Sequence, residues 1–106
     1  MFYELRRYQT RPGRRDEWVR YMEDVIIPFQ VSKGMVITAS FVDEDDEDGY
    51  LWMRRFEDEA QRERLYAETY DSDRWKDEIA PAVDELLIQE KIVVTRVVPT
   101  SKSVLR

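Results

Sequence analysis

The order in which strand-like and helical periodicities follow one another constrains the fold of this chain more than any other feature. Residues Phe2–Thr10 alternate in side-chain character as a strand does, and Arg11-Pro12-Gly13 then ends the strand. From Arg14 onward, apolar residues recur at three- and four-residue spacing, which predicts a helix. These residues are Trp18, Met22, Val25, Ile26 and Phe29. Pro28 should kink or end this helix, because proline lacks the N–H that the helical ladder needs.

Two further strand-like runs predict an antiparallel hairpin. The run 35–43 is rich in β-branched and aromatic residues, and the run 50–56 resumes the alternation. The acidic tract 43–48 connects them, and we expect it to be a solvated hairpin tip because its like charges repel one another. A calcium loop is not expected, since the glycine and the carboxylate that such a loop needs at its sixth and twelfth positions are absent.

The remainder of the chain predicts helical segments followed by one strand. One helix is expected over 57–70, and another begins at Arg74 and restarts at Pro81, with Asp71-Ser72-Asp73 between them. Residues 92–98 form the last strand. The resulting β-α-β-β-α-β order predicts an α+β, ferredoxin-like fold, in which a four-stranded antiparallel sheet carries its helices on one face.

The alternation within the strands separates two sets of residues, one for each face of the sheet. The first set is apolar, and we expect it to meet the helices: Leu5, Ile37, Ala39, Leu51 and Met53. The second set mixes aromatic, polar and charged residues, and we expect it on the helix-free face: Phe2, Glu4, Arg6, Tyr8, Thr38, Ser40, Tyr50, Trp52, Arg54 and Phe56.

The aromatic residues of the second set predict a partner for the helix-free face. A large aromatic side chain buries about 150–250 Å² when it is covered. Several of them together would exceed the few hundred Å² of apolar patch that is usual on a monomer. We therefore expect a homodimer that forms through the sheet face and encloses a polar cavity. The alternative is a half-wetted antiparallel sheet that tolerates aromatic residues among its charges.

Charge and missing residue types argue against several classes of function. The net charge is −6 and the arginines are interspersed with acids, so we expect no nucleic-acid partner. The chain has no cysteine and no histidine, which removes the thiol nucleophile, the commonest general base and the usual metal and haem ligand. We therefore expect no cofactor and no metal site. No apolar run approaches the ~20 residues of a membrane span, so we expect a cytoplasmic protein without a membrane partner.

Short segments spread along the chain resemble the NIPSNAP family. Phe2-Tyr3-Glu4-Leu5-Arg6-Arg7-Tyr8, followed by Arg11-Pro12-Gly13, is similar to the E-L-R-x-Y strand and the P-G turn with which that family begins. Tyr50-Leu51-Trp52-Met53-Arg54-Arg55-Phe56 and Tyr70-Asp71-Ser72-Asp73-Arg74-Trp75 resemble a second segment of the family and its D-x-x-W turn. The Pro99-Thr100-Ser101 ending is also similar.

The resemblance implies a dimeric α/β barrel, in which two ferredoxin-like domains pair sheet to sheet. On this view residues 1–99 form a NIPSNAP-like domain and residues 100–106 form a C-terminal tail. The wider group includes cofactor-free monooxygenases, isomerases, haem-handling proteins and stress-responsive proteins. The family pattern singles out five residues without assigning them a role: Glu4, Arg6, Tyr8, Trp52 and Trp75.

The charged residues of the expected cavity are the candidates for catalysis. Glu4 would act as a proton acceptor, while Arg6 and Arg54 would anchor a carboxylate or an enolate. The alternative is a structural ion pair that fixes the strand or dimer register. The candidates for ligand binding all carry an aromatic ring, and they are Tyr8, Tyr50, Trp52, Tyr66 and Trp75. Their alternative role is packing in the interface or the core.

Two functions lead from the sequence, and haem handling, which would need a Tyr, Met or carboxylate ligand in place of histidine, ranks below them. The first is a homodimer that binds a small anionic or aromatic molecule, with cofactor-independent monooxygenase or isomerase activity as its catalytic form. The second is a non-catalytic interaction or stress-response module. Whether the chain is an enzyme is undecided at this level.

Overall fold

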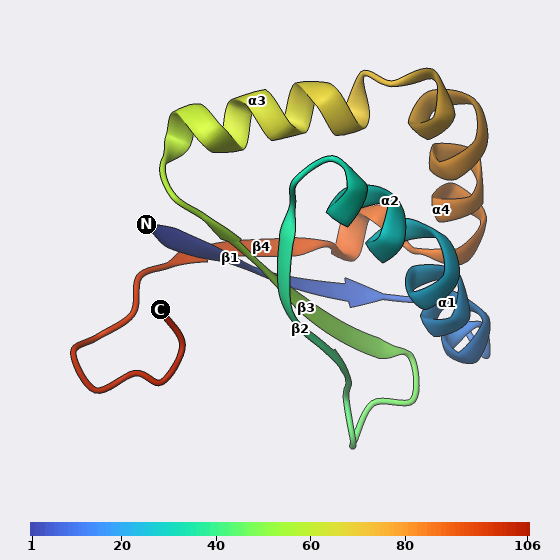
Figure 1. Ribbon diagram of the computed structural model, residues 1–106. Coiled ribbons are helices and arrows are strands. Elements are labelled where there is room, and N and C mark those ends of the chain that lie inside the picture. Colours follow the sequence, from blue (N-terminus) through green and yellow to red (C-terminus); the bar gives the residue numbers. More distant parts are fainter.

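Four antiparallel strands form one sheet in the order β2-β3-β1-β4 in the computed structural model, which describes residues 1–106 (Figure 1). The strands are β1 (Phe2–Gln9), β2 (Val36–Val42), β3 (Gly49–Phe56) and β4 (Val93–Val97). Because β1 pairs with both β3 and β4, the first strand lies in the interior of the sheet while β2 and β4 form its edges. The predicted β-α-β-β-α-β order is confirmed.

The helices all lie on one side of this sheet (Figure 1). The first crossover contains α1 (Arg15–Tyr21), the π-helical turn η1 (Met22–Ile26) and α2 (Ile27–Ser32). The second contains α3 (Glu59–Tyr70), the π-helical turn η2 (Trp75–Ile79), α4 (Ala80–Leu86) and the short 3-10 helix η3 (Gln89–Lys91). Asp58 caps α3 by accepting a hydrogen bond from the backbone N–H of Gln61. No helix is both long and apolar enough to cross a bilayer.

Pro28 does not end the first helical segment, which was one of the two outcomes predicted for it. The segment continues to Ser32. The π-helical turn η1 ends at Ile26, and Ile27 and Pro28 are the first two residues of α2. Pro81 has the same relationship to η2 and α4. A π turn shifts the backbone hydrogen-bond register, which accommodates a proline that cannot donate to it.

The helices cover the opposite set of strand residues from the one that the sequence analysis assigned to them. The covered set is Phe2, Glu4, Arg6, Tyr8, Ser40, Tyr50, Trp52, Arg54 and Phe56, of which most are buried. The uncovered face carries Leu5, Leu51, Met53 and Ala39, which had been expected in the core. Ile37 alone of that apolar set faces the helices, because a bulge at Thr38 shifts the register of β2 against β3 between Ile37 and Ala39.

The covered face mixes aromatic residues with polar and charged ones yet is well packed, and this packing explains why the helices cover it. Trp18, Met22 and Ile26 from the first crossover pack against Tyr8 and Trp52 in the main core cluster. The charged members of the same face find partners on α3, as described below. Alternation therefore identifies which residues share a face, but pairing with distant groups decides which face the helices cover.

The helix-free face is predominantly apolar. Across the strands, Leu5 of β1 lies between Met53 of β3 and Thr95 of β4, and Leu51 lies between Phe41 and Arg7. The side chain of Phe41 is 60% exposed. The residues expected to line a polar cavity on this face lie on the opposite, helix-covered face.

Candidate functional site

A single carboxylate lies at the centre of a charged cluster between the sheet and α3. Glu4 is 2% exposed, and its oxygens accept hydrogen bonds from Arg54 Nη2 at 2.6 Å and from Arg62 Nε at 2.8 Å. Arg6 Nη1 lies 3.3 Å from the same carboxylate. The hydroxyl of Tyr66 donates to Glu4 at 2.8 Å. Three guanidinium groups thus surround one acid.

This environment determines the protonation state of Glu4. Burial alone would raise the pKa of its carboxyl group, but the charge of Arg54 and the hydrogen bonds from Arg62, Tyr66 and Arg54 lower the pKa to about 2. A carboxylate of such low basicity is a poor proton acceptor at neutral pH. The role of general base, which the sequence analysis assigned to Glu4, does not fit this geometry.

Arg54 is fully buried and holds the cluster together. Beyond Glu4, its Nη1 donates to the Gln30 side-chain oxygen at 3.0 Å and to the Tyr70 hydroxyl at 2.6 Å. Its guanidinium carbon lies 4.9 Å from the centre of the Trp52 ring. Arginine suits this position because its planar fork both stacks on rings and donates in several directions.

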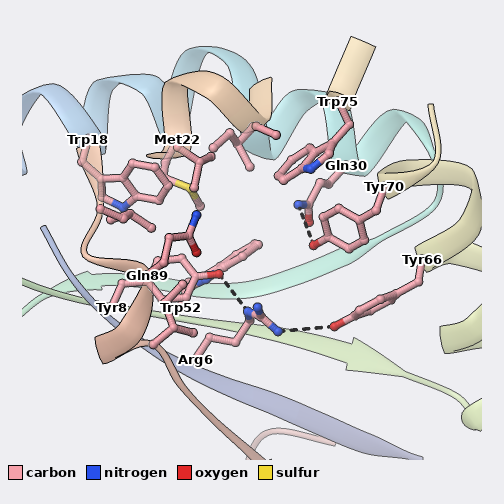
Figure 2. A pocket seen from close by; sticks show the side chains of 15 residues that line it. Arg6, Tyr8, Trp18, Met22, Gln30, Trp52, Tyr66, Tyr70, Trp75 and Gln89 are labelled. Atoms are coloured by element: carbon pink, nitrogen blue, oxygen red, sulfur yellow. Dashed lines mark hydrogen bonds between the residues drawn. The ribbon is translucent and has the colours of Figure 1, made fainter. Parts of the chain in front are cut away.

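A cavity of about 250 Å³ lies beside this cluster, between the sheet and the helices. Figure 2 shows the side chains that line it, which come from β1, β3 and both crossovers. The lining is mainly apolar and aromatic, with Arg6 as its one charged side chain: Arg6, Tyr8, Trp18, Met22, Ile26, Gln30, Trp52, Tyr66, Tyr70, Trp75, Ala80, Val83, Leu87, Gln89 and Ile92. A mostly apolar wall with a few convergent polar groups is typical of ligand sites.

Arg6 joins the charged cluster to the cavity. Its side chain is 15% exposed, donates through Nε to the Tyr8 hydroxyl at 2.9 Å and through Nη1 to the Tyr66 hydroxyl at 3.3 Å (Figure 2). Its Nη2 makes no hydrogen bond within the chain. Arg6 therefore has donor capacity left for a molecule in the cavity.

The aromatic wall contains every tryptophan of the chain, namely Trp18, Trp52 and Trp75. Trp75 packs edge-on against Tyr70 with ring centres 4.7 Å apart. The indole N–H groups of Trp18 and Trp52 are buried and have no hydrogen-bond partner. Unpartnered buried donors are uncommon, and a bound acceptor is one way to satisfy them.

Most of the residues singled out from the sequence meet at this site. Arg6, Tyr8, Trp52, Tyr66 and Trp75 line the cavity. Glu4 and Arg54 lie behind its wall in the charged cluster. Tyr50 does not line the cavity; it packs in the core beside Tyr8 and Trp18 and hydrogen-bonds to Ser40, and burial raises its pKa to about 12.

Several residues of the site were not foreseen. Arg62 belongs to α3, where it stands four residues before Tyr66 and eight before Tyr70, so the stripe Arg62-Tyr66-Tyr70 was a readable signal. Gln30 and Gln89 carried no such signal, because nothing local distinguishes them from surface glutamines. The two π-helical turns were also missed, although Met22, Ile26 and Trp75 within them line the cavity. Such turns occur frequently at functional sites.

The acidic hairpin tip lies away from the cavity and is organised by hydrogen bonds. The Asp43 carboxylate accepts from the backbone N–H groups of Asp45 and Asp46. Arg15 Nη1 donates to the carbonyl oxygens of Asp43 and Asp46. No group of three or more acidic side chains converges there or elsewhere in a way that could hold a metal ion.

Comparison with known families places the chain. The family model described as NIPSNAP matches residues 3–103. The chain belongs to the NIPSNAP family. The resemblance read from the sequence is thereby confirmed. No curated protein matches it.

Solved structures similar to this NIPSNAP protein share its fold. A NIPSNAP family protein of unknown function from Agrobacterium tumefaciens has a TM-score of 0.89 at 22% identity, with 100% of this chain and 94% of that chain covered. An uncharacterised NIPSNAP-like domain protein from Burkholderia xenovorans has a TM-score of 0.85 at 20% identity, with 96% and 87% covered. A structure described as an antibiotic biosynthesis monooxygenase has a TM-score of 0.63 at 16% identity, with 93% and 100% covered. These likenesses show that the chain shares the ferredoxin-like fold of those structures.

Proposed function

We propose that this NIPSNAP protein binds a small aromatic anion in the cavity between the sheet and the helices. The observation that carries the proposal is the position of Arg6, whose guanidinium enters an otherwise uncharged, aromatic cavity with one nitrogen unpartnered. An aromatic ring would stack among Tyr8, Trp52 and Trp75, and its anionic group would accept from Arg6.

The volume of the cavity limits the ligand. A cavity of roughly 150 Å³ holds benzene. At about 250 Å³, this one has room for one substituted ring or two fused rings. Larger ligands would have to displace side chains of the wall.

The charge balance favours an anion. Arg6 and Arg54 both contact the one buried carboxylate, Glu4, so this part of the interior carries an excess of one positive charge. Arg62 contacts Glu4 as well, and it also pairs with the exposed Glu59. A buried charge without a counter-ion is costly, and an anionic ligand would compensate it.

If the protein is catalytic, this site suits a reaction in which negative charge develops on the substrate. Arg6 would stabilise an enolate or a phenolate, as a cofactor-independent monooxygenase or isomerase requires. Glu4 and Arg54 would act as positioning residues that hold Arg6, because neither lines the cavity. The structural likeness to a protein described as an antibiotic biosynthesis monooxygenase supports this direction.

The helix-free face supports a second part of the proposal, namely a homodimer. Its central side chains, Leu5, Leu51 and Met53, are flanked by the exposed Phe41 and Val93. A largely apolar face, interrupted by Arg7 between Leu51 and Val93, favours an interaction site, and a second copy would supply the same face through a two-fold axis. The dimer thus rests on residues different from those first expected. This face alone would equally serve the alternative, a non-catalytic interaction module.

Binding of 2-naphthoate tests the ligand proposal. It carries two fused rings and a permanent negative charge, and all three tryptophans line the cavity, so we expect it to quench the intrinsic fluorescence and to release heat in titration calorimetry. Arg6→Gln should weaken binding about tenfold or more, since a charge-assisted hydrogen bond is worth about 1.5–3 kcal/mol. Arg64→Gln is the matched control, because Arg64 is exposed on α3 and makes no ion pair. Equal binding by the two variants would contradict the proposal.

A further inference from the structure

We propose that the natural ligand is a weakly acidic phenol or enol and that the cavity holds it as its anion. This inference rests on the proposed binding function and narrows it to a class of compound. Two observations carry it: the hydrogen-bonding character of the cavity wall and the charges that face Arg6.

The hydrogen-bonding groups left free in the wall are donors. Arg6 Nη2 has no partner, and the Tyr8 hydroxyl accepts from Arg6 Nε but keeps its own hydrogen. The buried indole N–H groups of Trp18 and Trp52 are unpartnered as well. A ligand oxygen without a hydrogen can accept from Arg6 Nη2 and from the Tyr8 hydroxyl, which lies next to Arg6.

Two acceptors of the wall near Arg6 are already engaged. The side-chain oxygen of Gln30 accepts from Arg54, and the Tyr66 hydroxyl accepts from Arg6 and Arg54 while it donates to Glu4. The amide oxygen of Gln89 is free, but this side chain is exposed at the edge of the cavity. A ligand O–H held beside Arg6 would find the oxygens of Gln30 and Tyr66 already occupied, whereas a ligand oxygen without a hydrogen can accept directly from Arg6.

The charges that face Arg6 from each neighbouring element leave its positive charge available. On β1 they are Glu4 and the hydroxyl of Tyr8, and on β3 Arg54 adds a second positive charge. The helices α1, α2 and α4 contribute no acidic side chain to the lining. Glu4 is the one anion of the cluster, and it is bound more closely by Arg54, at 2.6 Å, than by Arg6, at 3.3 Å.

On α3, Tyr66 and Tyr70 face Arg6 as phenols, and Arg62 adds positive charge behind them. Burial raises the pKa of Tyr66 to about 12, so it remains protonated at neutral pH. None of these groups supplies the negative charge that would neutralise Arg6.

The proton balance of binding needs no base in the protein. The O–H bond of the phenol or enol breaks, its electron pair stays on the oxygen that accepts from Arg6, and the proton passes to bulk water or buffer. Glu4, with its pKa near 2, does not take it up. The site would thus favour the electron-rich form of its ligand through binding alone.

The test uses 4-nitrophenol, whose phenol and phenolate absorb at different wavelengths, titrated with acid in the presence and absence of the protein. An opposite charge within 4–6 Å shifts a pKa by about 1–3 units, so the bound phenol should ionise at a pH lower by about that amount. This corresponds to tenfold to thousandfold tighter binding of the phenolate than of the phenol. Arg6→Gln should remove the shift and Arg64→Gln should keep it.

4-Nitroanisole separates the possible outcomes, because it has the same ring and cannot ionise. Much weaker binding of 4-nitroanisole than of 4-nitrophenolate supports the inference. Equal binding of both, with no shift in the ionisation of 4-nitrophenol, overturns it and leaves ring binding in place. If neither the nitrophenol nor 2-naphthoate binds, the proposed function is wrong as well. Should Arg6→Gln fail to fold, the comparison of the two compounds on the unmodified protein decides alone.

Discussion

Arg54 on β3 donates to Glu4 on β1 at 2.6 Å, and the two residues sit directly opposite each other in the antiparallel register. Both side chains are almost completely buried, at 0% and 2% exposure. The pair links the centre of the sheet to α3, because Tyr66 and Arg62 contact the same carboxylate. It is therefore a structural element on which the shape of the cavity depends.

Replacing Glu4 should destabilise the fold strongly. Glu4→Gln leaves the buried guanidinium of Arg54 without its counter-ion, and removal of one partner of a buried pair costs about 3–5 kcal/mol. Urea unfolding followed by circular dichroism measures this change. Glu63→Gln, an exposed change on α3, is the control and should stay within about 0.5 kcal/mol of the unmodified protein. Similar values for the two variants would mean that the pair contributes little.

The stability of the protein should fall in acid through the same carboxylate. Its pKa is lowered from the ordinary 4.5 to about 2, so its contribution is complete above pH 4.5 and is lost as the pH falls toward 2. The shift corresponds to roughly 3 kcal/mol. Urea unfolding at several pH values between 5 and 2.5 should show a steeper loss for the unmodified protein than for Glu4→Gln. Parallel curves would show that other carboxylates account for the acid sensitivity.

Filling the cavity should abolish ligand binding without harming the fold. Ala80 lines the cavity, and Ala80→Leu adds apolar volume to existing space. We expect an unchanged or higher melting temperature together with at least tenfold weaker binding of 2-naphthoate in calorimetry. Ala67→Leu, on an exposed position of α3, is the matched control. Undiminished affinity of Ala80→Leu would place the ligand elsewhere.

A charge on the helix-free face should prevent the proposed dimer. Met53 pairs with Leu5 at the centre of that face, so Met53→Glu would bring two carboxylates into an apolar interface. Light scattering after size exclusion should give twice 12.8 kDa for the unmodified protein and 12.8 kDa for the variant. Val104→Glu, on the fully exposed tail, should leave the mass unchanged. A monomeric unmodified protein would refute the dimer.

The sequence was sufficient to predict the order of the elements but not which face of the sheet the helices cover. The periodicities of β1 and β3 correctly grouped Glu4, Arg6, Trp52 and Arg54 on one face. That the helices cover this face could not be read from the strands, because the partners that make burial of Glu4 favourable, Arg62 and Tyr66, lie about sixty residues away. The sequence analysis therefore also expected the site residues on the wrong face of the sheet.

Within the site, the residue types were foreseen better than their roles. The cavity does bring Arg6 together with Tyr8, Trp52, Tyr66 and Trp75. The pKa of Glu4 could not be foreseen, since it depends on how many donors reach one carboxylate. The π-helical turns were equally hidden, because a one-residue change of helical register leaves the three- and four-residue pattern nearly intact.

The division of the strand residues between a helix-covered and a helix-free face also has an evolutionary consequence. In β1 and β3, even-numbered positions face the helices, where the charged cluster and the cavity lie, and odd-numbered positions face the helix-free side. Neighbouring residues of one strand therefore lie on different faces of the sheet. If the proposed dimer and ligand site are correct, a substitution at Leu5 or Met53 alters self-association while the pocket is conserved, and a substitution at Arg6 or Trp52 alters ligand preference while the outer surface is conserved. Two properties encoded in the same short strands can therefore diverge independently among homologues.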